Sequence, residues 1–132
     1  MIERLSSGGP WESAVGYSRV VRAGDLVLTA GCTSVVDGVV THPGDAYRQA
    51  LAAFSLALRQ IERVGASAAD VVQTRMYVVD AAHCDAVGEA HRELFGDAPP
   101  AATMVLVAGL VDAQMLVEVE VVAYRPQREE PQ

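Results

Sequence analysis

Two glutamates near the carboxyl end of the sequence carry the side chains most able to do chemistry. Glu118 and Glu120 lie within residues 115–124, where the alternation of residue types predicts a strand. Side chains two residues apart on a strand share one face and lie roughly 7 Å apart. The pair allows two roles: ion pairs with an arginine of a neighbouring strand, or a carboxylate that holds or activates water. The spacing alone favours the ion pairs.

Arg75 is the basic residue best placed to meet these carboxylates. Within the β-branched run 70–79, Arg75 and Tyr77 share one face of the predicted strand. The other face carries Met76 and Val78, which are typical core residues. If they are core, Arg75 and Tyr77 lie on the same face of the sheet as the glutamates. Arg75 could then clamp an anionic ligand or neutralise one of the carboxylates.

Histidine and cysteine are also present, but their surroundings favour structural roles. His91 is a lone histidine in a predicted helix, where packing is the commoner role. Cys32 stands beside Gly31 at a strand end without the motif of a nucleophile, so a buried, unreactive thiol is expected. Cys32 and Cys84 lack the CxxC spacing of a zinc or redox site and do not make a disulfide scaffold. We therefore expect no metal site.

The composition limits the classes of protein to which this chain can belong. The 132 residues are 51% hydrophobic and 20% charged, which suits one domain over residues 1–125 with a polar tail at 126–132. Acidic residues outnumber basic ones by 17 to 10, the net charge is −7, and no basic run predicts a nucleic-acid partner. All the basic residues are arginines, so Schiff-base chemistry on a lysine is excluded.

The sequence also predicts a cytoplasmic protein without a membrane partner. The first residues lack the apolar segment of a secretory signal, which favours a reducing compartment. The longest nearly uncharged stretch, 98–111, is too short to cross a bilayer.

Hydrophobic periodicity predicts an α+β fold. One helix is expected between the cap Asp45 and Gly65, and a second over residues 82–95. The first ten residues are expected to form a loop. Strands are predicted at 15–21, 25–30, 35–40 (a hairpin around Asp37-Gly38), 70–79, 103–108 and 115–124. This order predicts a mixed β-sheet with two helices packed on one face.

One predicted strand, 103–108, is apolar on both of its faces. One face can pack under the helices, but the second needs another cover, and no third helix is predicted. The simplest cover is a second copy of the same chain; the alternative is a return of the chain's own strands. We expect a homo-oligomer with its open sheet faces turned inward.

Several motifs occur in the order and spacing of one protein family. They are Gly16-Tyr17, residues 24–31 (GDLVLTAG), residues 70–80 (DVVQTRMYVVD), and the closing segments 100–105 (PAATMV) and 116–123 (LVEVEVVA). Through these motifs almost the whole chain resembles the Rid family (RidA, also called YjgF), small trimeric proteins with a chorismate mutase-like fold. The resemblance implies that fold and a homotrimer.

The resemblance also implies a reaction and the residues that perform it. Rid proteins hydrolyse reactive enamines and imines to ketones and ammonia, without a metal or cofactor, in a cleft between adjacent subunits. By this resemblance Tyr17 lines the cleft, the backbone at Gly31 contacts the substrate, and Glu118 holds the water. A small-molecule substrate is the expected ligand.

Three positions depart from the family pattern. Ala102 stands where the family has the arginine that binds the substrate carboxylate, Gly88 replaces an asparagine, and Gly16 replaces a proline. The chain thus resembles a subgroup that lacks the arginine. Its substrate is expected either to have no carboxylate or to be held by Arg75 or Arg19.

Three functions remain open at this point. The first, which we favour, is cofactor-free hydrolysis, deamination or tautomerisation of an enamine, an imine or a related small molecule. The second is a trimeric module that binds a metabolite without turnover. The third is a biosynthetic enzyme that cyclises or hydrolyses a bulkier, less polar substrate, which an apolar lining of Ala102, Met104 and Leu106 would suit.

Overall fold

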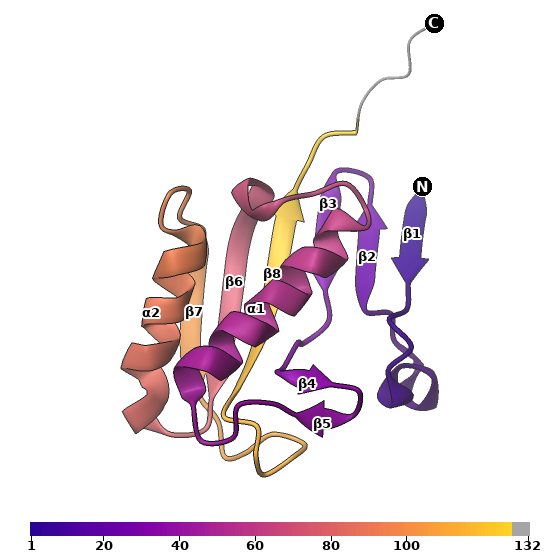
Figure 1. The fold of residues 1–132 in the computed structure, drawn as a ribbon. Helices are drawn as coiled ribbons and strands as arrows, with labels where there is room; N and C mark the ends of the chain where they lie inside the picture. Colours follow the sequence, from indigo (N-terminus) through magenta and orange to yellow (C-terminus); the bar gives the residue numbers. More distant parts are fainter. Residues whose placement is uncertain (128–132) are drawn as a thin grey trace, which may run out of the picture.

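A six-stranded mixed sheet forms the body of the computed structural model, which describes residues 1–127 (Figure 1). Across the sheet the strand order is β1-β2-β3-β8-β6-β7; β6 and β7 are parallel, and the other neighbours are antiparallel. The bounds are β1 Ile2–Leu5, β2 Val20–Ala23, β3 Leu26–Thr29, β6 Val71–Val78, β7 Ala101–Leu106 and β8 Val117–Tyr124. The last strand of the chain therefore lies inside the sheet, and β7 forms one edge.

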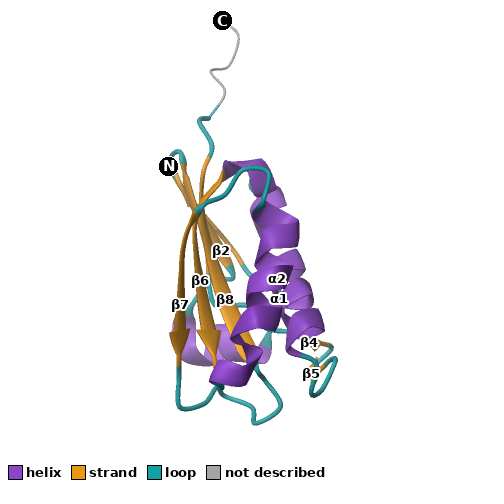
Figure 2. Ribbon diagram, turned by 90° about the vertical axis from the view of Figure 1, so that its left-hand side faces the viewer, coloured by secondary structure: helices purple, strands orange, loops and turns teal. Residues whose placement is uncertain are grey.

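Two helices cover one face of this sheet (Figure 2). α1 (Ala46–Glu62) starts at Asp45, whose carboxylate accepts a hydrogen bond from the Arg48 amide at 3.0 Å, as the sequence predicts. α2 (Cys84–Phe95) connects the parallel strands β6 and β7, which need such a crossover. The predicted α+β fold, with both helices on one face of a mixed sheet, is confirmed.

Alternation along β8 separates the core from the open face of the sheet. Val117, Val119 and Val121 are buried under the helices. Glu118 and Glu120 lie between them in the sequence and therefore point to the opposite face. The predicted placement of both glutamates on the open face is confirmed.

The amino-terminal segment differs from the prediction. The strand β1 lies within the ten residues expected to form a loop; it has no apolar alternation and is held by its pairing with β2. A single π-helical turn, η1 (Glu12–Gly16), stands where the strand 15–21 was predicted, and β2 begins only at Val20. Gly16 ends this turn with φ of +92°, which glycine adopts readily and proline cannot.

The predicted hairpin at 35–40 is confirmed. β4 (Val35–Val36) and β5 (Val39–Val40) pair with each other, and the two turn residues both have positive φ, 50° at Asp37 and 78° at Gly38. Positive φ at both positions is the geometry of a two-residue hairpin turn.

The edge strand β7 is largely exposed along its length. Val105 and Leu106 point to opposite faces and are 42% and 56% exposed. Met104 is half-buried and packs against the core. Both faces of this strand therefore present apolar side chains to the surface.

Beyond β8 the chain stays attached to the sheet for a short distance. The Arg125 amide donates to the Asp25 carbonyl at 2.8 Å, and the Gln127 amide donates to the Asp25 carboxylate at 3.1 Å. Of the predicted polar tail 126–132, residues 128–132 lie outside the described residues. Within residues 1–127, no helix has the length and apolar character needed to cross a membrane.

Candidate functional site

Glu118 packs directly against the turn that follows β3. A Cβ placed on Gly31 would lie 2.8 Å from Cδ of Glu118 and 2.9 Å from its Oε2, which is closer than real Cβ contacts, so the carboxylate fits here only against glycine. The next residue, Cys32, exchanges two backbone hydrogen bonds with Val119, of 2.7 and 2.9 Å, and these fix the turn to β8. The structure therefore brings together Gly31 and Glu118, two of the predicted site residues.

The Glu118 carboxylate is half-buried and forms no ion pair with any of residues 1–127. Burial raises its pKa, the negative charge of Glu120 raises it further, and the positive charge of Arg19 lowers it in part. A carboxylate with a raised pKa is a better proton acceptor than an ordinary one. This environment suits a group that accepts a proton from water.

Arg19 connects the Gly31 turn to Tyr17, the predicted tyrosine of the cleft. Its guanidinium donates to the Gly31 carbonyl at 2.5 Å and to the Tyr17 hydroxyl at 3.3 Å. The centre of the guanidinium also lies 5.4 Å from the centre of the Tyr17 ring, within the range of a cation–π contact. Tyr17 is thus tied through Arg19 to the turn that packs on Glu118.

Glu12 holds Arg19 from the other side. Its Oε2 lies 3.6 Å from Nε of Arg19. The same carboxylate accepts hydrogen bonds from the Ser6 hydroxyl, from the amide and hydroxyl of Ser7, and from the Gly9 amide. Burial raises the pKa of Glu12, but the hydrogen bonds from Ser7, Ser6 and Gly9 outweigh it and bring the pKa down to about 2. We call Glu12, Tyr17, Arg19, Gly31 and Glu118 the Glu118 site.

Glu120, unlike Glu118, is paired within the part of the chain that the structure describes. Its carboxylate accepts a hydrogen bond of 2.5 Å from the Tyr77 hydroxyl and lies 3.8 Å from Nη1 of Arg75. The hydrogen bond to Glu120 raises the pKa of Tyr77. The predicted ion pair between Arg75 and a glutamate is confirmed, and Arg75 is engaged with that carboxylate. We call Arg75, Tyr77 and Glu120 the central cluster.

His91 and Cys32 have the structural roles that the sequence favours. Nε2 of His91 lies 2.8 Å from the Thr74 hydroxyl, and the ring packs against Phe54 and Phe95. Burial lowers the pKa of His91 and raises the pKa of the Cys32 thiol, so both groups favour their neutral forms. In the part of the chain that the structure describes, no three His, Cys, Asp or Glu side chains gather as metal ligands.

Ala102 and Met104, the other predicted lining residues, lie apart from Glu118. Their partners across the β6–β7 ladder are Thr74 and Met76, both buried on the helix side. Ala102 and Met104 therefore face the helix side, whereas Glu118 faces the open side. In addition β6 separates β7 from β8, which places β7 about 10 Å from β8. A single chain does not bring these two residues into one site with Glu118.

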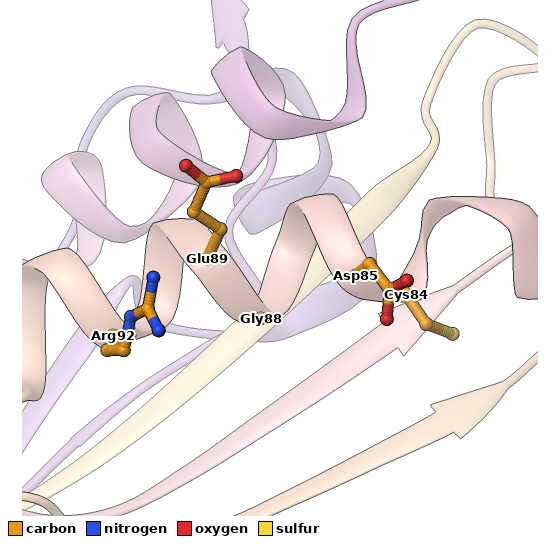
Figure 3. Close-up of a pocket in the computed structure, with 5 residues that line it drawn as sticks. All are labelled: Cys84, Asp85, Gly88, Glu89 and Arg92. Atoms are coloured by element: carbon orange, nitrogen blue, oxygen red, sulfur yellow. The ribbon is translucent and has the colours of Figure 1, made fainter.

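A hollow of about 400 Å³ lies along α2 (Figure 3). Its lining residues are Cys84, Asp85, Gly88, Glu89 and Arg92. A Cβ on Gly88 would meet no atom within 4 Å, so the glycine leaves this surface open. The hollow shares no residue with the Glu118 site. Gly88, which replaces an asparagine of the family pattern, lies on α2 and therefore on the helix side of the sheet.

Glu12 is the member of the site that sequence reasoning missed as a functional candidate. A signal was available in Ser6-Ser7-Gly8-Gly9, a run of small residues with many hydrogen-bond donors just ahead of an acidic residue. Such a run can wrap its amides and hydroxyls around a carboxylate, as it does here.

Comparison with protein families and individual proteins gives a consistent result. The family model described as Endoribonuclease L-PSP matches residues 10–125. The Streptomyces coelicolor protein SCO2049, whose name describes it as uncharacterized, is 40% identical over 124 residues, which cover 94% of this chain and 92% of that protein.

Solved structures agree with this match. Rv2704 from Mycobacterium tuberculosis, described as a member of the highly conserved YjgF/YER057c/UK114 family, is 41% identical with a TM-score of 0.85, over 94% of this chain and 99% of that one. The YjgF gene product of E. coli is 25% identical with a TM-score of 0.76, over 92% and 93% of the two chains. The resemblance to RidA/YjgF proteins and their chorismate mutase-like fold is confirmed, and the chain belongs to the Endoribonuclease L-PSP family, with the YjgF/UK114 proteins as its structural relatives.

Proposed function

We propose that the protein hydrolyses the carbon–nitrogen double bond of a small imine or enamine, without a cofactor, in a cleft between adjacent subunits of a homotrimer. One observation carries the proposal: Glu118 is a half-buried carboxylate with a raised pKa, packed on a glycine turn, and without an ion pair among residues 1–127. A carboxylate with only a structural role on this face has partners, as Glu120 has. The family resemblance supplies the reaction class.

In the proposed reaction Glu118 holds a water molecule and accepts one of its protons while the water oxygen bonds to the imine carbon. Glu118 passes this proton to the nitrogen, which gives the neutral carbinolamine. It then accepts the hydroxyl proton as the carbonyl forms and passes it to the nitrogen, so that the carbon–nitrogen bond breaks and ammonia leaves. An imine and water thus give a ketone and ammonia, with no change in oxidation state. An enamine first takes a proton on carbon to become the imine. A positioned general base contributes about 10²- to 10⁴-fold to such a rate.

A second copy of the chain is needed to complete the proposed cleft. Ala102 and Met104 lie two strands from Glu118 and face the other side of their own sheet. In the proposed trimer the edge strand β7 of one subunit, on which Ala102 is exposed, lies against the Glu118 site of the next subunit. Light scattering should then give three times the chain mass of 14.0 kDa. A monomer at the concentrations used for assays would contradict the cleft.

The description of the matched family names an RNA-cleaving activity, and the charge of this chain argues against it here. Proteins that bind RNA neutralise phosphates with clustered lysines and arginines. This chain has a net charge of −7 and no lysine, and the open face of its sheet carries Glu118 and Glu120. Incubation with a single-stranded RNA should therefore leave the RNA intact.

The test of the proposed function is ammonia release from a panel of imines generated in situ from amino acids and from neutral amines. Wild-type protein should act on neutral imines, and Glu118→Gln should abolish most of this turnover. Binding without ammonia release would support the metabolite-binding module instead. Turnover confined to bulky apolar substrates would support the biosynthetic alternative.

The substitution Ala102→Arg is the matched test of substrate class. A bidentate arginine–carboxylate contact contributes on the order of 1.5–3 kcal/mol, which is about 10- to 150-fold in rate. The variant should gain this factor on imines that carry a carboxylate and gain nothing on neutral ones. Wild-type turnover of carboxylated imines at the rate of the variant would show that another residue anchors the carboxylate.

A further inference from the structure

Arg19 is a buried charge that the proposed reaction does not use. It lies just ahead of β2, is 9% exposed, and directs its guanidinium to the Gly31 carbonyl and the Tyr17 hydroxyl. Burial of a cation costs free energy unless the cation is paired and hydrogen-bonded. A buried cation next to a carboxylate with a perturbed pKa is therefore a candidate for a functional role.

Glu12 compensates this charge and fixes its direction. The Glu12 carboxylate is 4% exposed, and it is enclosed by donors from Ser6, Ser7 and Gly9 at 2.5–3.1 Å. Its pKa of about 2 keeps it ionised at every pH at which the protein would work. The loop that precedes η1 is thus folded around an anion whose one cationic partner within residues 1–127 is Arg19.

A second buried arginine, Arg22, has a purely structural role and serves as a comparison for Arg19. Arg22, in β2, is 7% exposed and donates to three backbone carbonyls, those of Gly24, Val64 and Arg125. These contacts tie the end of α1 and the end of β8 to the sheet. Arg19 differs because its partners are a carboxylate, a hydroxyl and the carbonyl of the turn that packs on Glu118.

We propose that Arg19, held by Glu12, is a positioning residue of the Glu118 site, which holds the Gly31 turn against the Glu118 carboxylate, ties the Tyr17 hydroxyl to that turn, and presents a positive charge to the carboxylate. The inference rests on the proposed function in one respect, that Glu118 is the group that acts on the substrate. Because its Nη donors already meet Gly31, Cys32 and Tyr17, Arg19 supports the site and is not assigned to substrate binding.

The charges around Glu118 give this role a distinctive signature. The titratable groups that face it are Arg19 ahead of β2, Cys32 after β3, Tyr77 on β6 and Glu120 on β8 itself. Arg19 is the cation of this set. Loss of its charge should raise the pKa of Glu118. Loss of the Glu12 charge leaves Arg19 uncompensated and should lower the same pKa.

The experiment is a titration of the Glu118 carboxyl carbon by NMR in protein labelled with ¹³C-glutamate, with the signal assigned by its disappearance in Glu118→Gln. Arg19→Gln should move the Glu118 pKa up and Glu12→Gln should move it down. Arg22→Gln, the control with equal burial, should lower the melting temperature and leave the pKa where it is. A Glu118 pKa that Arg19→Gln leaves unchanged, or that both site variants move in one direction, would overturn the inference.

Arg19→Lys keeps the test decisive if Arg19→Gln does not fold. It retains the positive charge but loses the planar fork that reaches two acceptors at once. The Glu118 pKa should stay near that of wild type, while the rate falls because Tyr17 and the Gly31 turn lose their common partner. A lysine variant with wild-type rate would overturn the positioning role.

Kinetics separate this inference from the proposed function. If imine hydrolysis occurs, the acid limb of its pH–rate profile should follow the Glu118 pKa upward in Arg19→Gln and downward in Glu12→Gln. The NMR titration needs no substrate. If the protein hydrolyses imines but the titration lacks the expected pKa shifts, only the role of Arg19 is overturned. If the titration shows the expected shifts but no ammonia is released, only the proposed function is overturned.

Discussion

The Glu118 site and the central cluster lie on the same face of the sheet, and each contains one glutamate of β8. The two glutamates differ in the partners that surround their carboxylates. In the central cluster, Tyr77 and Arg75 both approach the Glu120 carboxylate. In the Glu118 site an arginine is also present, but its guanidinium is directed to Glu12, Gly31 and Tyr17. A carboxylate that is satisfied within its own sheet supports the fold, whereas one left without a partner beside a buried cation is available to a ligand.

The largest difference between the two regions should appear in the rate. Glu118→Gln keeps the volume and removes the charge, and it should lower turnover of a neutral imine by about 10²- to 10⁴-fold. Glu120→Gln, measured on the same substrate, should lower turnover by a factor less than about one tenth as large. Equal losses in the two variants would show that the two glutamates act together and that Glu120 is not limited to a structural role.

Acid should weaken the Glu118 site through Glu12. The pKa of Glu12 is about 2 in the folded protein against an ordinary 4.5, so its stabilisation is complete above about pH 4.5 and is lost as the pH falls toward about 2. A shift of this size corresponds to on the order of 3 kcal/mol.

Urea unfolding at fixed protein concentration, compared at pH 6 and pH 3, measures this effect. Glu12→Gln should be less stable than wild type at pH 6 and should lose less stability on acidification. A wild type and a variant with parallel acid dependence would show that the loop is not organised by the Glu12 charge.

Gly31→Ala should displace the Glu118 carboxylate without unfolding the protein. The added Cβ meets the far end of a flexible side chain, at 2.8 Å from Cδ, and the carboxylate can swing away. A misplacement of about 1 Å in a reacting group costs about 10²-fold in rate, and the melting temperature should change little. The same substitution at Gly88, in the interior of α2 with open space around it, is the control; it should leave the rate unchanged and raise the melting temperature, because alanine is a better helix former than glycine.

The smallest effects concern stability in the central cluster. Glu120→Gln weakens the Tyr77 hydrogen bond and the Arg75 ion pair, both partly exposed, and should cost about 1 kcal/mol of unfolding free energy. Glu118→Gln removes a half-buried charge that has no ion pair within residues 1–127, and should raise the melting temperature. Calorimetry of the two variants at one concentration distinguishes these signs, and a more stable Glu120→Gln protein would reverse the assignment of roles.

Sequence patterns predicted the parts of this protein that are governed by periodicity. The helices, the hairpin turn and the alternation along β8 are set by spacing within single segments, and the pairing of Arg75 with Glu120 followed from matching the faces of two strands. The family resemblance named Gly31 and Glu118, which the structure places in contact.

The amino-terminal segment could not be predicted in the same way. β1 has no pattern of its own and depends on pairing with β2, and the π-helical turn depends on Glu12 and Gly16. The position of Ala102 and Met104 relative to Glu118 depends on the strand order, because β6 lies between β7 and β8. Both features depend on contacts between segments that are distant in the sequence, and the spacing of residues along the sequence does not predict such contacts.

The interior position of β8 has a consequence for how the protein is made. This strand is synthesised after every other strand of the sheet, and until it arrives β3 and β6 have no neighbour between them. The pairing of β3 with β8 joins residues 26–28 to residues 122–124, so nearly the whole chain must be synthesised before the sheet can close. A nascent or truncated chain therefore exposes two unpaired strand edges, the condition that favours aggregation and chaperone binding. Emergence of β8 from the ribosome is the step that allows this sheet to close.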